Sequence, residues 1–170
     1  TFMTSGTNPV TGTFTWTPSA GTGGQSFPVM FSASDGHNPA VTATTTANVA
    51  FSPVSFFGGK LSWTHHLSLA ENSNMQTWTA KLANPNSVTV YAQVTIVGTD
   101  GTGTTGFTTI SSTFTLTGGA SITPTITQTF PATDIGVKFH FTATIMWGTS
   151  PTALTSPGGN TKTGSFTIVS

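Results

Sequence analysis

Few side chains in this sequence could take part in acid–base or nucleophilic chemistry. The 170-residue chain contains four Lys and no Arg, four histidines, no cysteine, and four carboxylates at Asp35, Glu71, Asp100 and Asp134. Catalysis requires titratable groups that are brought together, and these carboxylates are scattered along the chain. The sequence also lacks a Gly-x-Ser-x-Gly elbow and a phosphate loop. We therefore expect a protein that is not an enzyme, with no catalytic residues, no cofactor and no cofactor-binding residues.

The histidines do not have the spacing of metal ligands. His65 and His66 are adjacent, and neighbouring side chains of a regular strand point to opposite faces. His65 shares its register with Trp63 and Leu67, which predicts a partly buried histidine. His140 falls on the outer register of its own strand-like run and is expected on the surface. These positions predict no metal site.

Asp35 and Asp100 each precede a glycine. Asp-Gly is a dipeptide typical of turns, whereas a calcium site needs several clustered carboxylates. We therefore interpret both aspartates as turn residues, and we expect a fold that needs no metal ion.

Exposed aromatic residues could instead form a strip that binds carbohydrate. Trp16, Trp63 and Trp78 all lie in the apolar register of their strand-like runs, which predicts that they belong to the core. Trp147 precedes Gly148 at a strand end and is the one tryptophan that we expect to be exposed. No Asn begins an Asn-x-Ser/Thr sequon with x other than Pro, which excludes N-glycans on that motif.

Alternation of apolar and polar residues with period 2 predicts strands along the whole chain, and no stretch of ten residues has a helical period. Before the short linker at Ser52 and Pro53 the runs are Phe14 to Trp16, Phe27 to Ala33 and Val41 to Phe51. After it they are Leu61 to Leu69, Trp78 to Leu82, Val88 to Ile96, Ile110 to Leu116, Ile122 to Phe130, Val137 to Ile145, and Phe166 to Ile168. Seven strands in about 110 residues are typical of an immunoglobulin-like sandwich.

The sequence thus predicts an all-β fold, an immunoglobulin-like antiparallel β-sandwich with one complete module and one partial module. Residues 1–52 would form the partial module of three strands, and residues 53–170 the seven-stranded sandwich. The side chains expected in the core of the sandwich are Trp63, Trp78, Val90, Val94, Phe114, Phe139 and Phe141.

The partial module has to be completed by other chain segments, because three strands cover only one apolar face. One possibility is a strand donated by another subunit, for which the candidate donors are Thr1 to Val10 and Ser165 to Ser170. The alternatives are an upstream half in the same polypeptide, or packing of the first strands of the second module over the apolar face.

The composition indicates the surroundings of the protein. Charged residues make up 5% of the chain and the formal net charge is zero, so we expect no binding to nucleic acid or to an anionic membrane surface. Because cytosolic proteins usually stay soluble through surface charge, a neutral surface rich in Thr indicates an extracellular or cell-surface location.

No apolar run approaches the roughly 18 residues of a membrane span. The first residues lack the basic and apolar regions of a signal peptide, and we expect any such peptide to have been removed.

Two stretches resemble known families. Residues 11–18, which read TGTFTWTP, and residues 31–36, which read FSASDG, resemble immunoglobulin-like repeats of large bacterial and archaeal surface proteins, over residues 10–51. In that family these motifs lie in the second half of the repeat, so the resemblance implies a module without its first half. Residues 81–147 are similar, more loosely, to cell-adhesion-related immunoglobulin-like modules. Both resemblances imply surface display in repeats, stalks, sheaths or filaments, and neither implies a catalytic residue.

The leading interpretation is a structural subunit of an extracellular filament, sheath or surface layer, of prokaryotic origin. Its expected partners are copies of itself, which would make a homopolymer, and cell-surface glycans are a second candidate. One alternative is an adhesion or glycan-binding module of a larger cell-surface protein. The other is a viral capsid or tail-fibre domain, since these use the same sandwich.

Overall fold

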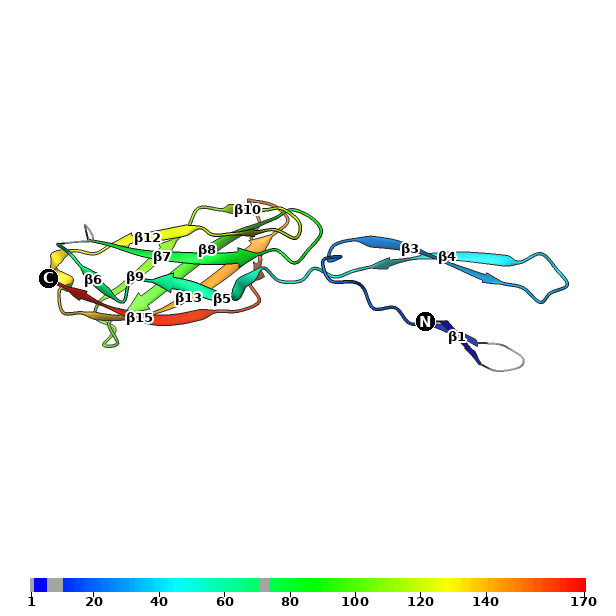
Figure 1. The fold of residues 1–170 in the computed structure, drawn as a ribbon, viewed down its shortest axis with the longest axis horizontal. Coiled ribbons are helices and arrows are strands. Elements are labelled where there is room, and N and C mark those ends of the chain that lie inside the picture. Colours follow the sequence, from blue (N-terminus) through cyan, green and yellow to red (C-terminus); the bar gives the residue numbers. More distant parts are fainter. Residues whose placement is uncertain (1, 6–10, 71–73) are drawn as a thin grey trace.

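The structure is a computed structural model that describes residues 2–5, 11–70 and 74–170. Figure 1 shows a β-sandwich from one end of which a narrow pair of strands projects. The prediction of an all-β sandwich is confirmed: within these ranges the one helix is a single 3-10 turn, η1 (Ala132–Asp134). No helix in them is long and apolar enough to cross a membrane.

The sandwich consists of two facing sheets. The larger has the strand order β10-β8-β13-β15-β6, with β9 also pairing with β8 and β14 with β13. Its strands are β6 (His66–Ser68), β8 (Val90–Thr99), β9 (Gly106–Ile110), β10 (Phe114–Leu116), β13 (Lys138–Gly148), β14 (Ser156–Pro157) and β15 (Lys162–Val169). The smaller has the order β11-β7-β12, with β5 also pairing with β7. Its strands are β5 (Ser55–Trp63), β7 (Met75–Ala83), β11 (Ser121–Ile122) and β12 (Thr125–Thr129). All pairs are antiparallel except β6 with β15.

The core lies between the sheets, where β7, β8 and β13 bury every second residue. Five of the seven predicted core residues are at most 3% exposed: Trp78, Val90, Val94, Phe139 and Phe141. The prediction is wrong for Trp63 and Phe114, which are only half-buried. Trp63 is the last residue of β5, and Phe114 begins the short outer strand β10, so neighbouring strands cover each of them incompletely.

The predicted strand from Leu61 to Leu69 is divided between the two sheets. β5 ends at Trp63 in the smaller sheet, and the chain then crosses over so that β6 runs parallel to β15 in the larger one. The crossing interrupts the alternation, so Leu67 is buried whereas His65 is exposed. The predicted partial burial of His65 is therefore wrong.

Two further predicted strands are interrupted, one by a β-bulge and the other by a proline. Ile110 pairs with Thr95 and Phe114 pairs with Ala92. The chain between Ile110 and Phe114 therefore has one more residue than the facing part of β8, as in a β-bulge. Pro124 separates β11 from β12 and has no N–H to donate to the ladder, although its carbonyl still accepts the Ala80 N–H at 3.0 Å.

The part of the chain before the sandwich forms two-stranded antiparallel hairpins. β1 (Phe2–Ser5) pairs with β2 (Thr11–Phe14), and β3 (Ser26–Ala33) pairs with β4 (Val41–Asn48). We call β3 and β4 together the ribbon. β5 pairs with β7 rather than lying over the ribbon. How the partial module is completed stays a prediction.

Candidate interaction surfaces

The titratable residues do not converge on a reactive centre. The described residues include no group of three or more His, Cys, Asp or Glu side chains that could hold a metal ion. His140 lies on the surface, as predicted, and His66 is exposed as well. Glu71 lies outside the described residues.

Asp35 organises the tip of the ribbon. Its Oδ1 accepts the backbone N–H groups of Asn38 and His37 at 2.8 and 2.9 Å, and its Oδ2 accepts Nδ2 of Asn38 at 2.8 Å. Hydrogen bonds to a carboxylate favour its ionised form, and these lower the pKa of Asp35 from 3.8 to about 2. Asp35 is thus a turn residue, as its sequence context predicted.

Asp100 has the same role in the loop between β8 and β9. Desolvation is the largest single effect and raises its pKa, but the hydroxyl and N–H of Thr102 and the N–H groups of Thr105 and Gly103 together outweigh it, so the pKa of Asp100 lies below its ordinary value. Both aspartates use their oxygens to order their own loops.

We expect Asp35 to titrate near pH 2 in the folded chain. Because folding lowers this pKa, the turn is stabilised above the unfolded value of 3.8 and loses that stabilisation as the pH falls through about 2. Asn38→Ala removes one side-chain donor and keeps both backbone donors, so the pKa should rise only part of the way to 3.8. An NMR acid titration of the carboxyl carbon measures both values. A midpoint of 3.8 or above in the unaltered chain would contradict the turn geometry.

Two buried asparagines connect the sandwich to the chain that carries the ribbon. Asn84 is 1% exposed, and its Nδ2 donates to the carbonyls of Val88, Leu116 and Thr117 at 2.8, 3.1 and 3.1 Å. Its Oδ1 accepts the backbone N–H and Nδ2 of Asn86 at 3.0 and 2.9 Å. Asn84 therefore holds the loop before β8 against the loop after β10.

Asn86 extends this network to the base of the ribbon. Its side-chain amide pairs with the backbone of Ser52: the Ser52 N–H donates to Oδ1 at 2.8 Å, and Nδ2 donates to the Ser52 carbonyl at 2.9 Å. The Gly23 carbonyl accepts the N–H and Oγ of Ser87 at 3.2 and 2.9 Å. A Cβ on Gly23 would collide with Oδ1 of Asn86. The ribbon thus projects from a closely packed junction, whose contacts the sequence analysis did not predict.

An aromatic contact supports the same junction. The rings of Phe51 and Trp147 lie 6.1 Å apart, and Nε1 of Trp147 donates to the Pro157 carbonyl at 2.9 Å. Trp147 is consequently 6% exposed, and the prediction that it is an exposed tryptophan is wrong.

One face of the ribbon is apolar and poorly covered. The register places large residues of β3 opposite small ones of β4: Phe27 with Ala47, Val29 with Thr45, and Phe31 with Ala43. The cover comes from Trp16 and Phe14, whose rings meet those of Phe27 and Phe31 edge-on at 5.0 and 5.9 Å. Trp16 and Phe14 are themselves 38% and 43% exposed, so the predicted burial of Trp16 is wrong. A hollow of about 490 Å³ lies between them and β3.

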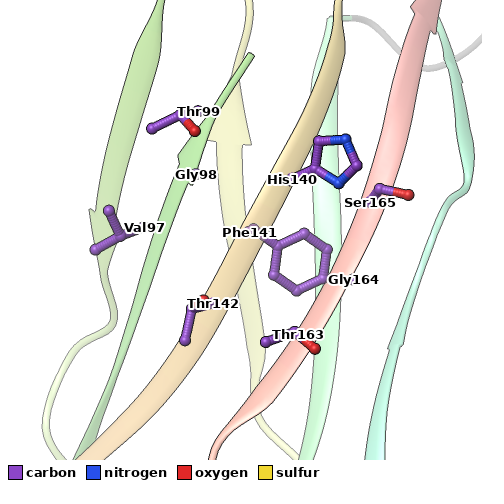
Figure 2. Close-up of a pocket in the computed structure, with 9 residues that line it drawn as sticks. All are labelled: Val97, Gly98, Thr99, His140, Phe141, Thr142, Thr163, Gly164 and Ser165. Atoms are coloured by element: carbon purple, nitrogen blue, oxygen red, sulfur yellow. The ribbon is translucent and has the colours of Figure 1, made fainter. Parts of the chain in front are cut away.

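A second depression, of about 580 Å³, lies on the larger sheet of the sandwich. Figure 2 shows its lining on three adjacent strands: Val97, Gly98 and Thr99 on β8; His140, Phe141 and Thr142 on β13; and Thr163, Gly164 and Ser165 on β15. The depression offers hydroxyl groups and one imidazole, but its lining has no tryptophan or tyrosine. It could bind a neutral polar ligand.

The chain was compared with protein families, curated proteins and solved structures. No protein-family model and no curated protein matches the chain. Among solved structures, the CARDB domain of a protein from Pyrococcus furiosus, crystallised in complex with di-metal ions, is similar with 12% sequence identity and a TM-score of 0.43. The match covers 70% of this chain and 90% of that domain.

Proposed function

We propose that this chain is a structural subunit of an extracellular filament, sheath or surface layer, and that it associates with other copies of itself through the ribbon. One observation supports this most strongly. Among the described residues before Val54, Gly23 alone is buried, so the ribbon and the segment beside it have no enclosed core. Exposed apolar surface of this kind is typical of an interaction site.

The charge distribution supports association between copies. Asp35 is the one Asp, Glu, Lys or Arg among the first 59 residues. Two such surfaces can approach with little like-charge repulsion, because the one carboxylate of each lies at the tip of the ribbon. Their burial removes apolar area from water at about 25 cal/mol per Å². The junction at Asn84 and Asn86 holds the ribbon out from the sandwich, where another copy can reach it (Figure 1).

The role we propose is mechanical rather than catalytic. The sandwich would carry load through its backbone ladders and its apolar core, and the ribbon would join one subunit to the next. The near absence of charged side chains supports an extracellular location. Cell-surface glycans are a second candidate partner, for which the depression lined by Thr142, Thr163 and Ser165 provides hydroxyl groups.

We expect Val41→Glu to weaken self-association about tenfold or more, because it places a charge on the apolar face of the ribbon. Val41 is 73% exposed, so the substitution costs the monomer little. Val97→Glu is the matched control: Val97 is 46% exposed on the outer face of the sandwich, away from the ribbon. Sedimentation equilibrium of the full chain measures both dissociation constants. A chain that stays monomeric at every concentration, or equal losses in both variants, would exclude the ribbon as the contact.

A further inference from the structure

Most strand edges in this fold carry a feature that hinders pairing with another chain. Natural sheets protect their edges with prolines, bulges, charges or short strands. β3 contains Pro28, β5 has glycines of positive φ at Gly58 and Gly59, and β11 and β12 are separated by Pro124. β9 and β10 are divided by a bulge, and β1, β2, β6 and β14 have four residues or fewer.

β4 differs from all of these strands. It has eight residues, Val41–Asn48, with the sequence VTATTTAN and without proline, glycine or charge. Among the described strands it pairs with β3 alone. Uncharged segments of high β-propensity without proline are those that pair with copies of themselves. The outer edge of β4 is therefore the least protected strand edge in the described chain.

The ladder shows which groups face this edge. Val49 N–H donates to the Gln25 carbonyl at 2.9 Å, and alternate pairs of an antiparallel ladder exchange hydrogen bonds. The odd-numbered residues of β4 therefore bond to β3, and Thr42, Thr44, Thr46 and Asn48 direct their N–H and C=O groups outward. Pro28 pairs with Thr46, a position that directs no N–H toward β4, which agrees with this assignment.

We propose that β4 pairs antiparallel with β4 of a second copy across a two-fold axis at Thr45, an inference that rests on the proposed function. One such isologous contact satisfies the outer edges of both copies at once. The residues whose N–H and C=O groups face outward must pair with the same kind of residue in the other copy. An axis at Thr45 pairs Thr42 with Asn48 and Thr44 with Thr46 of the other copy. This register pairs all four outward residues of the strand, whereas an axis at Thr44 would pair only three of them. The result is one four-stranded sheet shared by two subunits.

Disulfide trapping tests the register. The native chain has no cysteine, so single substitutions report cleanly. At the axis Thr45 faces Thr45 of the partner subunit as a non-hydrogen-bonded pair with Cα atoms about 4.5 Å apart, within the range of a disulfide. Val41 lies on the same strand and is also exposed, but it would be roughly 27 Å from its own copy at about 3.4 Å per residue.

Under mild oxidation Thr45→Cys should therefore yield a covalent species of twice the 17.4 kDa chain mass, whereas Val41→Cys should remain at the single mass. Association of the unaltered chain is measured in parallel by light scattering. If it associates but Thr45→Cys does not cross-link, the β4 pairing is wrong and the proposed function stands. If nothing associates, both are wrong. If both variants cross-link equally, the antiparallel register is overturned.

A proline substitution tests the edge itself. Thr44→Pro removes an outward N–H and no bond to β3, so it should abolish the dimer while the thermal unfolding of the sandwich stays unchanged. Thr44→Val keeps the N–H and should dimerise as the unaltered chain does. Thr44→Lys, which adds a charge at the same edge, replaces the proline variant if that variant does not fold. Full dimerisation of a folded Thr44→Pro or Thr44→Lys chain would overturn the proposal.

Discussion

Val94→Asp is expected to unfold the sandwich, whereas Thr95→Asp, one residue further along β8, is expected to leave it folded. Val94 is fully buried in the core, and Thr95 is half-buried on the outer face, where it pairs with Ile110 and Thr144. An unpaired charge in the core costs several kcal/mol. That loss is comparable with the roughly 5–15 kcal/mol that stabilises a domain of this kind.

Urea denaturation followed by far-ultraviolet circular dichroism measures this difference. Val94→Ala is a useful third variant, because it removes packing without adding charge and should cost only about 2 kcal/mol. Equal losses for Val94→Asp and Thr95→Asp would mean that the register of β8 is wrong or that an assembly buries both of its faces.

Asn84→Asp should destabilise the sandwich by about 3–5 kcal/mol, although it changes hardly any volume. The substitution replaces Nδ2, which donates to three carbonyls, by an oxygen that faces the same carbonyls. At 1% exposure no water compensates for the lost donors. Burial would raise the pKa of the new carboxyl above its unfolded value of about 3.9. The loss should therefore increase as the pH rises above about 4.

Asn48→Asp is the matched control for this substitution. Asn48 is exposed, and its Oδ1 accepts Oγ of Ser26 at 2.6 Å, a bond that a carboxylate can also accept. Its effect on sandwich stability should stay within about 0.5 kcal/mol. Denaturation curves at two pH values measure both variants. A loss for Asn84→Asp that is as small as that for Asn48→Asp would show that the three carbonyls find other donors.

The central strands were predictable because local pattern and tertiary environment agree there. β8 and β13 have neighbours on both edges and one face on the core, so strict alternation marks their inward side chains, as at Val94 and Phe139. Period-2 alternation carries this information wherever a strand stays in one sheet.

The wrong predictions of burial and exposure depend on contacts that are distant in the sequence. The exposure of His65 follows from a change of sheet, and the burial of Trp147 from contact with Phe51, which is far away in the sequence. Trp16 has the register of a core residue, but the described chain does not supply the second layer that would bury it. An alternating pattern identifies an apolar face and does not show what covers it.

The junction could not have been predicted for a related reason. The residues Asn84-Pro85-Asn86 have the composition of a turn, and the Asn86 N–H donates to Oδ1 of Asn84. That the Asn86 amide also pairs with the backbone of Ser52, and that Gly23 must lack a side chain beside it, depends on contacts distant in sequence. No local signal indicates such pairs.

Hydrogen exchange at the Thr44 amide, followed as a function of protein concentration, tests the shared β4 edge most directly. If a second copy pairs with this edge, the Thr44 amide should exchange slowly at concentrations where the chain associates and quickly when it is diluted to monomer. The Val94 amide, which donates to Oγ of Ser111 inside the sandwich, should stay protected throughout and serves as the internal reference. A Thr44 amide that exchanges quickly in the associated state would contradict the shared edge.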